Sequence, residues 1–148
     1  MNNIPRNTGF TLTELLMLGV CCLLFVGCGG PKTKVVSGTV TVKGEKAQSG
    51  QVLFIPIEGT PGSNNAASIV DGEYRIEGRG GVMMGKYRVE VVAKKKTGRQ
   101  VMQDTGFEKA LADEYITISP PQYAGKQSPL TAEIDSSFDG RFDIDITP

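Results

Sequence analysis

Alternation between apolar and polar residues over short segments is the feature that most constrains how this chain folds. From Val36 to Val42 the valines fall on one face of an extended chain and the threonines on the other. The same period of two recurs in the segments 86–93, 130–135 and 142–147, whereas 51–57 is almost continuously apolar. Side chains of a β-strand point alternately to its two faces, so these segments are predicted strands with a buried face.

Turn residues separate the predicted strands. Asp71–Gly72 lies between 67–70 and 73–76, and an Asp-Gly pair in that position indicates a hairpin with a type I′ turn. The composition of 19 glycines, 8 prolines and 7% aromatic residues also suits a turn-rich β protein. We therefore expect an all-β fold, an antiparallel sandwich of about seven strands.

The segment from Lys94 to Gln127 departs from this pattern. It is polar and contains proline, and it is predicted to be a long loop, with one or two helical turns between Asp104 and Tyr115. Connections of that length are usually functional or disordered. The basic residues at its start, Lys94–Lys96 and Arg99, are expected to form a solvated loop that protects a strand end from edge pairing, and contact with anionic lipid headgroups is the alternative.

The N-terminal segment carries an export signal. Leu15–Gly27 is an apolar run that would extend only ~20 Å as a helix, short of the ~30 Å core of a bilayer. It ends abruptly at Cys28–Gly29–Gly30–Pro31, where glycine and proline stop a helix. This combination predicts a signal peptide and not a stable membrane span.

Phe25–Val26–Gly27–Cys28 resembles the lipobox of bacterial lipoproteins, in which a cysteine after small residues is lipidated and becomes the new N-terminus. The resemblance implies a signal peptide over 1–28 with lipidation at Cys28. A short tether over 29–34 and a β-sandwich domain over 35–148 would follow. The implied location is the bacterial cell envelope, with a lipid anchor in the membrane. Gly29 favours the outer membrane by analogy, because it stands where an Asp signals inner-membrane retention in enteric bacteria.

A second processing signal overlaps the first. Gly9, Phe10 and Glu14 resemble the prepilin cleavage motif, in which Phe follows the cleaved Gly and Glu is the fifth residue of the mature chain. This resemblance implies a pilin-like or pseudopilin assembly subunit processed after Gly9. Against it, the apolar helix ends near Gly27 instead of continuing into a long stalk. An uncleaved anchor is the third alternative.

Composition argues against several kinds of chemistry. The chain has 148 residues, with 16 basic and 16 acidic residues and no histidine. A net charge of zero predicts no nucleic-acid binding, and the lack of histidine excludes His-based nucleophile systems and His-ligated metals. All three cysteines fall within 21–28, which excludes a disulfide or a cysteine-ligated metal in the folded part. We expect a non-catalytic protein with no cofactor and no small-molecule substrate.

Four carboxylates near the C-terminus, at Asp135, Asp139, Asp143 and Asp145, are the remaining candidates for a metal or catalytic site. Their spacing does not match an EF-hand loop. Asp143 and Asp145 fall on one strand face, and an exposed terminal strand supplies no pocket that would raise the pKa of either. We interpret the group as a solvated strand face together with an Asp139–Gly140 turn.

Three strand motifs resemble the carboxypeptidase-regulatory-like (transthyretin-like) domain. They are Ser37–Val40, the hairpin Val70–Ile76 and Gly85–Val89. The resemblance covers roughly residues 35–147 and implies a seven-stranded accessory sandwich. It also implies that the Tyr87 ring lies in the core with its hydroxyl on backbone. An envelope protein or a polysaccharide is the partner class that an envelope-anchored binding module of this kind would contact.

Overall fold

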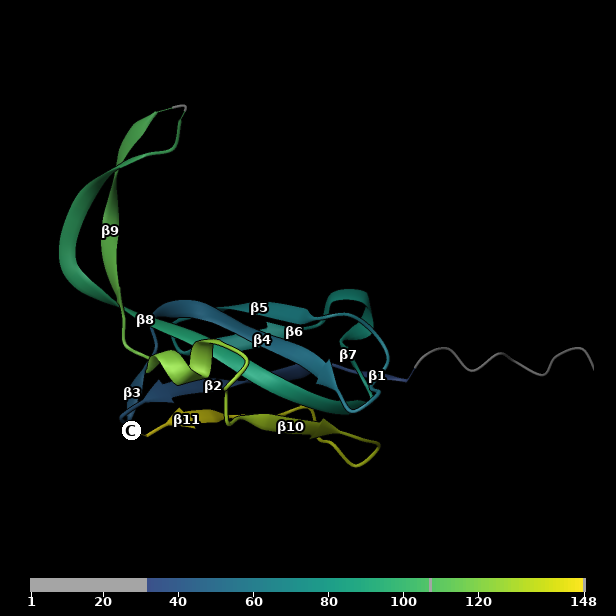
Figure 1. Ribbon diagram of the computed structural model, residues 1–148. Coiled ribbons are helices and arrows are strands. Elements are labelled where there is room, and N and C mark those ends of the chain that lie inside the picture. The colour runs from purple at the N-terminus through teal and green to yellow at the C-terminus, as the bar shows by residue number, and fades with distance from the viewer. Residues whose placement is uncertain (1–31, 107, 148) are drawn as a thin grey trace, which may run out of the picture. The chain divides into compact units, whose positions relative to one another are not determined.

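The computed structural model describes residues 32–106 and 108–147, with the backbone alone at Arg79. The chain there forms eleven strands and two short 3₁₀ helices (Figure 1). In chain order these elements are β1 (Thr33–Lys34), β2 (Val36–Val42), β3 (Glu45–Lys46), β4 (Ser49–Ile57), β5 (Asn65–Val70), β6 (Glu73–Ile76), η1 (Gly78–Gly80), β7 (Val82–Met83), β8 (Gly85–Asp104), β9 (Lys109–Thr117), η2 (Pro121–Ala124), β10 (Thr131–Ile134) and β11 (Ile144–Ile146). The all-β prediction is confirmed. Over the same residues, no helix is long and apolar enough to cross a bilayer.

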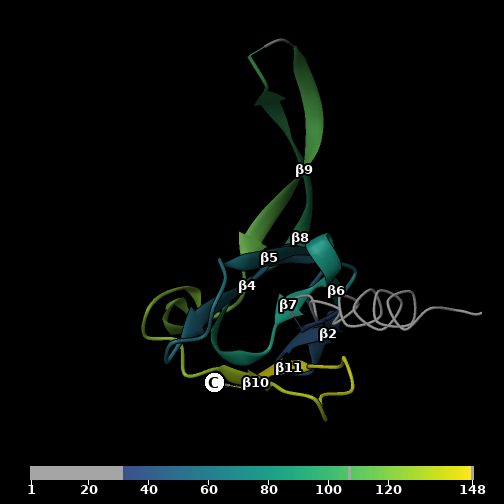
Figure 2. The same cartoon turned by 90° about the vertical axis from the view of Figure 1, so that its right-hand side faces the viewer.

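Seven strands make a continuous hydrogen-bonded path in the order β10-β8-β4-β5-β6-β2-β11. The path folds over on itself, so that β4 faces β6 across the core (Figure 2). The ring of Phe54 on β4 lies 6.3 Å from that of Tyr74 on β6 and 6.0 Å from that of Tyr87 on β8. The sandwich-like architecture is therefore confirmed, although β1, β3, β7 and β9 add four strands to the expected seven.

One strand pair departs from the antiparallel prediction. β11 runs parallel to β2, with Ile144 opposite Val40 and Ile146 opposite Val42. The segment after β10 brings the chain back beside β2 in the same direction, and that crossover leaves no local signature in the sequence. Alternation within β11 was predicted correctly, since Ile144 and Ile146 are buried.

The core is built from the residues that the alternation selected. Along β8 the burial alternates, with Tyr87, Val89, Val91 and Ala93 inside. The fully buried side chains of greatest volume are Tyr87, Phe54, Ile69, Ile134, Ile146, Val36, Val40, Val52, Val82, Val89 and Val91. β-Branched residues dominate this set, as expected for side chains packed on a pleated surface.

The Asp71–Gly72 turn has the predicted conformation, with φ of 49° at Asp71 and 83° at Gly72. Its role differs from that of an ordinary hairpin turn. β5 and β6 share one facing pair, Val70 with Glu73, while β5 pairs along β4 and β6 along β2. The turn therefore carries the chain from one half of the sandwich to the other.

The expected loop over 94–127 is wrong for most of its length. β8 continues to Asp104, β9 returns antiparallel to it, and η2 follows. The turn between the two strands is stabilised by Asp104, whose carboxylate accepts a 2.9 Å hydrogen bond from the Gly106 N–H. Both faces of this hairpin meet solvent, so it lacks the apolar alternation that marked the other strands. The expected tether is also shorter, because Thr33–Lys34 forms β1 and pairs with β7.

Candidate functional site

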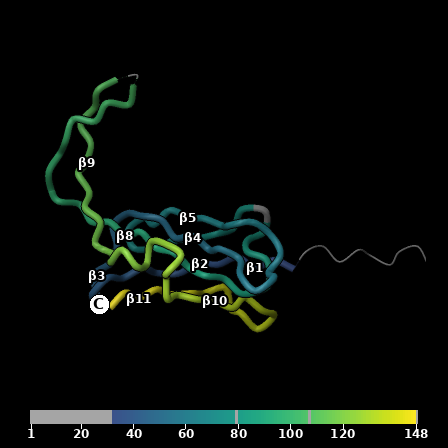
Figure 3. The backbone as a smooth tube through the Cα atoms, in the orientation of Figure 1, coloured from purple at the N-terminus to yellow at the C-terminus, as the bar shows by residue number. Residues whose placement is uncertain are grey.

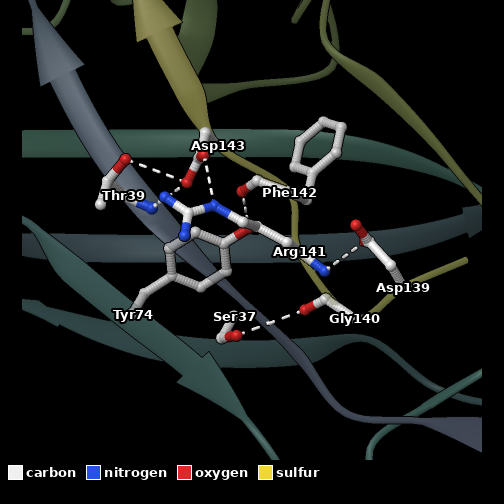
Figure 4. Close-up of polar contacts among 8 residues, drawn as sticks. All are labelled: Ser37, Thr39, Tyr74, Asp139, Gly140, Arg141, Phe142 and Asp143. Atoms are coloured by element: carbon white, nitrogen blue, oxygen red, sulfur yellow. Dashed lines mark hydrogen bonds and ion pairs between the residues drawn. The ribbon is translucent and has the colours of Figure 1, made fainter.

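The C-terminal carboxylates take structural roles. Asp143 accepts hydrogen bonds from the Thr39 N–H at 2.8 Å and hydroxyl at 3.0 Å, and from Arg141 Nε at 2.7 Å (Figure 4). The hydrogen bond from Arg141, followed by that from the Thr39 backbone, lowers the pKa of the Asp143 carboxyl to about 2. This carboxylate therefore joins β2 to the segment that precedes β11.

The other three carboxylates are engaged locally. Asp135 accepts hydrogen bonds from the N–H and hydroxyl of Ser137, Asp139 accepts one from the Arg141 N–H, and Asp145 accepts one from the Thr41 hydroxyl. Within residues 32–106 and 108–147 no group of three or more metal-ligating side chains comes together. The C-terminal carboxylates thus stabilise turns and strand pairing.

A close backbone contact holds the same region together. The Phe142 N–H donates to the Ser37 carbonyl at 2.8 Å, and the Phe142 carbonyl accepts a 2.6 Å hydrogen bond from the Tyr74 hydroxyl. A Cβ at Gly38 would lie 2.0 Å from the Phe142 oxygen, so only glycine permits this approach. Burial, with a smaller contribution from the charge of Asp143, raises the pKa of Tyr74.

An open groove of about 950 Å³ lies beside this contact, between β2, β5 and β6. Two of the charged residues that line it are already paired, since Arg75 binds Glu77 at 2.6 Å and Arg141 binds Asp143 at 2.7 Å. In the described part of the chain every buried side-chain nitrogen and oxygen has a hydrogen-bond partner. No buried polar side-chain atom there is therefore left without a partner.

The second candidate is the hairpin made by the outer half of β8 and by β9. We call residues 95–106 and 108–116 the arm and the other described residues the body. The arm leaves the body beyond the last β4–β8 pair, Ser49 with Lys94, and extends away from it, as the backbone trace in Figure 3 shows. No residue of the arm belongs to the buried core.

Exposed apolar side chains concentrate on the arm. Among the described residues six large hydrophobic side chains stay exposed, and five of them lie there: Val101, Met102, Leu111, Tyr115 and Ile116. Met102 is 64% exposed and Leu111 63% exposed, and the two face each other across the strands. A two-stranded hairpin is at best marginally stable in water, and exposed apolar side chains that cluster together mark interaction sites.

Ion pairs stiffen the base of the arm. Lys95 on β8 pairs with Glu45 on β3, and Lys96 pairs with Asp113 on β9 at 2.8 Å. The hydrogen bond between the latter two raises the pKa of Lys96 and lowers that of Asp113. The expectation that these lysines lie in a loop is wrong, because Lys94–Lys96 continue β8 in pairing with Tyr115–Thr117 on β9.

Sequence reasoning missed the arm, although one local signal pointed to it. Asp104–Thr105–Gly106 is a turn sequence, and the segments on either side of it contain Val101 with Met102 and Ala110 with Leu111. Gly106 has a φ of 82°, which the turn requires. The polar residues between the apolar ones concealed the pair of strands.

Cys28, the predicted lipidation site, lies outside the described residues, as do Gly9, Phe10 and Glu14. Comparison of the chain with protein-family models, with curated proteins and with solved structures finds no match. The resemblance to the transthyretin-like domain therefore stays a prediction resting on short motifs. The contact that it implied for Tyr87 is present: the ring is buried, and the hydroxyl donates a 2.8 Å hydrogen bond to the Met83 carbonyl.

Proposed function

We propose that this protein is a non-catalytic lipoprotein of the bacterial cell envelope, anchored through Cys28, whose β-domain presents the arm as a binding element. The observation that carries the binding role is the exposure of Met102 and Leu111 on a hairpin that buries none of its own side chains in the core. A chain gains nothing in folding stability from extending such an element into water, so a partner that covers it accounts for its presence.

The chemistry of the arm favours an envelope protein as partner over a polysaccharide. Aliphatic side chains are desolvated well by a protein surface, whereas sugars are recognised mainly by hydrogen bonds and by stacking on aromatic rings. Tyr115, 40% exposed, is the one exposed aromatic residue among the large hydrophobic residues of the described chain. The equal numbers of acidic and basic residues give no support for nucleic-acid binding.

The position of the anchor sets the working distance of the domain. Five peptide steps separate Cys28 from Thr33, the first residue of β1, and span at most ~17 Å when extended. A lipidated Cys28 would hold the domain close to the bilayer. That geometry suits a partner in or beside the same membrane.

The anchor is tested by the intact mass of the protein purified from membranes, beside a Cys28→Ala variant. A chain beginning at Cys28 with two or three acyl chains, absent from the variant, is the expected result. A chain beginning at methylated Phe10 would overturn the lipoprotein proposal and favour the pilin-like alternative processed after Gly9. That alternative rests on the Gly9–Phe10–Glu14 motif.

The binding role of the arm is tested separately with a photo-crosslinking residue placed at Met102 in the full chain in membranes. The matched control position is Val70 on β5, which is also 64% exposed but lies on the body. We expect a discrete protein adduct from position 102 and none from position 70. Equal labelling from both positions, or no adduct at all, would overturn the binding role.

A further inference from the structure

The edge of β9 is the regular free edge of the arm. Among the described residues β9 pairs with β8 alone, and its nine residues run without interruption. The pairing of β8 is broken by a register shift between Lys96 and Gln100, where Gly98 has a φ of 82°. Bulges protect an edge from further pairing, whereas an unbroken edge presents unpaired N–H and C=O groups to another strand.

We propose that the β9 edge binds the same edge of a second copy of this protein, antiparallel, about a two-fold axis at Leu111. The inference rests on the proposed function in one respect, that the arm is the binding element. In this register Leu111 lies opposite Leu111 of the second copy, and Ala110 lies opposite Ala112. The two arms then form one four-stranded sheet, which satisfies backbone groups that a single arm leaves to water.

The side chains on one face match across this axis. Met102 lies opposite Leu111 within each arm, so the pairing lines up four apolar side chains, Met102 and Leu111 from each copy, in one row. These are the two most exposed apolar residues of the arm. Facing apolar pairs are the unit of sheet stabilisation, and this register pairs the most exposed of them with each other.

The charges beside this row are complementary. Lys109 of each copy lies opposite Asp113 of the other, which forms two equivalent pairs of opposite charge. Within one arm Lys109 lies 4.0 Å from Asp104, and Asp113 lies 2.8 Å from Lys96, so acidic and basic groups alternate across the sheet. Opposite charges on facing residues favour this register.

Two neighbouring registers fit less well. An axis at Ala112 places Leu111 opposite Asp113. An axis at Asp113 places two carboxylates opposite each other, and it directs the partner's turn towards Ile118–Pro120. There the chain enters the body, and Ser119 is buried. With the axis at Leu111, the like charges that face each other are Glu108 and Glu114, in two equivalent pairs just beyond the five-residue overlap, where Glu108 is exposed.

The proposed interface involves only five residues from each strand. It is small in comparison with stable protein interfaces, which usually bury ~1,600 Å² in total. We therefore expect a weak dimer that depends on concentration. Two chains held in one membrane have a much higher effective concentration than in dilute solution. The experiment that tests for the dimer therefore uses the full chain in membranes.

The test is disulfide formation in membranes from the full chain carrying Leu111→Cys. Facing Cα atoms of antiparallel strands lie about 4.5–5.5 Å apart, within the range that a disulfide spans. We expect a covalent dimer well above the wild-type background, which accounts for the three native cysteines at 21, 22 and 28. Asp113→Cys, the axis of the competing register, is expected to give little dimer.

A charge-directed pair sharpens the test. One chain carries Lys109→Glu with Ala110→Cys, and the other carries Ala112→Cys with Asp113→Lys. Each chain meets like charges in its own homodimer, whereas the mixed dimer has two matched pairs and brings the cysteines face to face. We expect the mixed disulfide to predominate and to be lost when Leu111→Asp is added. Val70→Asp on the body, a site of equal exposure, is expected to leave it intact.

Two results would overturn the proposal. One is a Leu111→Cys chain that gives no more dimer than wild type, and the other is an Asp113→Cys chain that gives more dimer than Leu111→Cys. If position 102 crosslinks to a different protein while Leu111→Cys gives no dimer, the arm binds another partner and the proposed function stands without this inference. If neither experiment gives an adduct, both fail.

Discussion

The Tyr74 hydroxyl donates a 2.6 Å hydrogen bond to the carbonyl oxygen of Phe142, which lies 68 residues further along the chain. The donor stands on β6, and the acceptor belongs to the segment that leads into β11. This contact fixes the C-terminal segment beside β2, where the Phe142 N–H also donates to the Ser37 carbonyl at 2.8 Å. The last strand of the domain is therefore held by both the backbone and a buried side chain.

We expect Tyr74→Phe to lower the free energy of unfolding by about 1–3 kcal/mol, because the half-buried Phe142 carbonyl loses its hydrogen-bond donor. Urea unfolding at pH 7 measures the change. Tyr115→Phe removes a hydroxyl from a side chain that is 40% exposed, and it should change stability little. Equal effects from the two substitutions would show that the Phe142 contact contributes nothing particular.

Because of Tyr74, we also expect the domain to lose stability at high pH. Burial raises the pKa of Tyr74 above its ordinary value of about 10. A group whose pKa is raised in the folded state contributes its full stabilisation at pH values below its unfolded pKa. That stabilisation is lost as the pH rises from the unfolded pKa towards the folded pKa. Unfolding measured between pH 9 and 11 should therefore depend less on pH in Tyr74→Phe than in the wild type.

Among the described glycines whose φ is negative, Gly38 is the one at which alanine should destabilise the domain most. Its Cβ would lie 2.0 Å from the Phe142 oxygen, so β2 and the C-terminal segment must separate. We expect a loss of at least about 2 kcal/mol in thermal or urea unfolding. Gly125→Ala is the matched control, because a Cβ there meets nothing within 4 Å and φ is −153°. A Gly38→Ala protein as stable as the control would contradict the close approach.

Asp143→Asn should change how stability depends on acid. The Asp143 carboxyl has a pKa of about 2 in the folded state, below the value near 4 of an unfolded aspartate. A depressed pKa stabilises the fold above the unfolded value, and that stabilisation is lost as pH falls from about 4 towards 2. The effect is modest, because the side chain is 45% exposed and salt screens it.

Unfolding measured between pH 2 and 5 checks this prediction. The wild type should lose more stability across that interval than Asp143→Asn does. Asp139→Asn removes a carboxylate that accepts a backbone N–H only, and it serves as the control. If Asp143→Asn kept the acid sensitivity of the wild type, the contacts of Asp143 with Arg141 and Thr39 would not be the cause of the loss of stability in acid.

Replacing residues 97–114 with Asn-Gly should leave the body folded. Lys96 and Tyr115 would remain as the last facing pair, and Asn-Gly closes a two-residue hairpin. Because no arm residue is in the core, we expect the free energy of unfolding to change by less than ~1 kcal/mol. Circular dichroism and urea unfolding measure this, and loss of the cooperative transition would show that the arm is part of the folding unit.

Local sequence determined the seven strands of the hydrogen-bonded path and one of the turns between them. Alternation selected the buried residues of β2, β8 and β11, because the period of side-chain direction in a strand shows directly which face is buried. The Asp71–Gly72 conformation followed from the positive φ that both positions adopt. These features depend on residues adjacent in the chain, so one sequence suffices to predict them.

The arm shows where that reasoning stops. Apolar alternation reports burial against a core, and the arm has no core to face. Its strands form because Asp104 and Gly106 close the turn and because each strand satisfies backbone groups of the other. A pair of strands solvated on both faces has the composition of a loop, so the sequence suggested one.

Sequence by itself determined the all-β class, the seven strands of the hydrogen-bonded path and the lack of histidine chemistry, whereas the signal at the N-terminus stays a prediction. Tertiary structure alone decided that β11 lies parallel to β2, that β5 and β6 belong to opposite halves, and that Tyr74 meets Phe142. The reason is physical. A strand's periodicity records which of its faces is buried, whereas its neighbours are chosen by contacts between residues far apart in the chain.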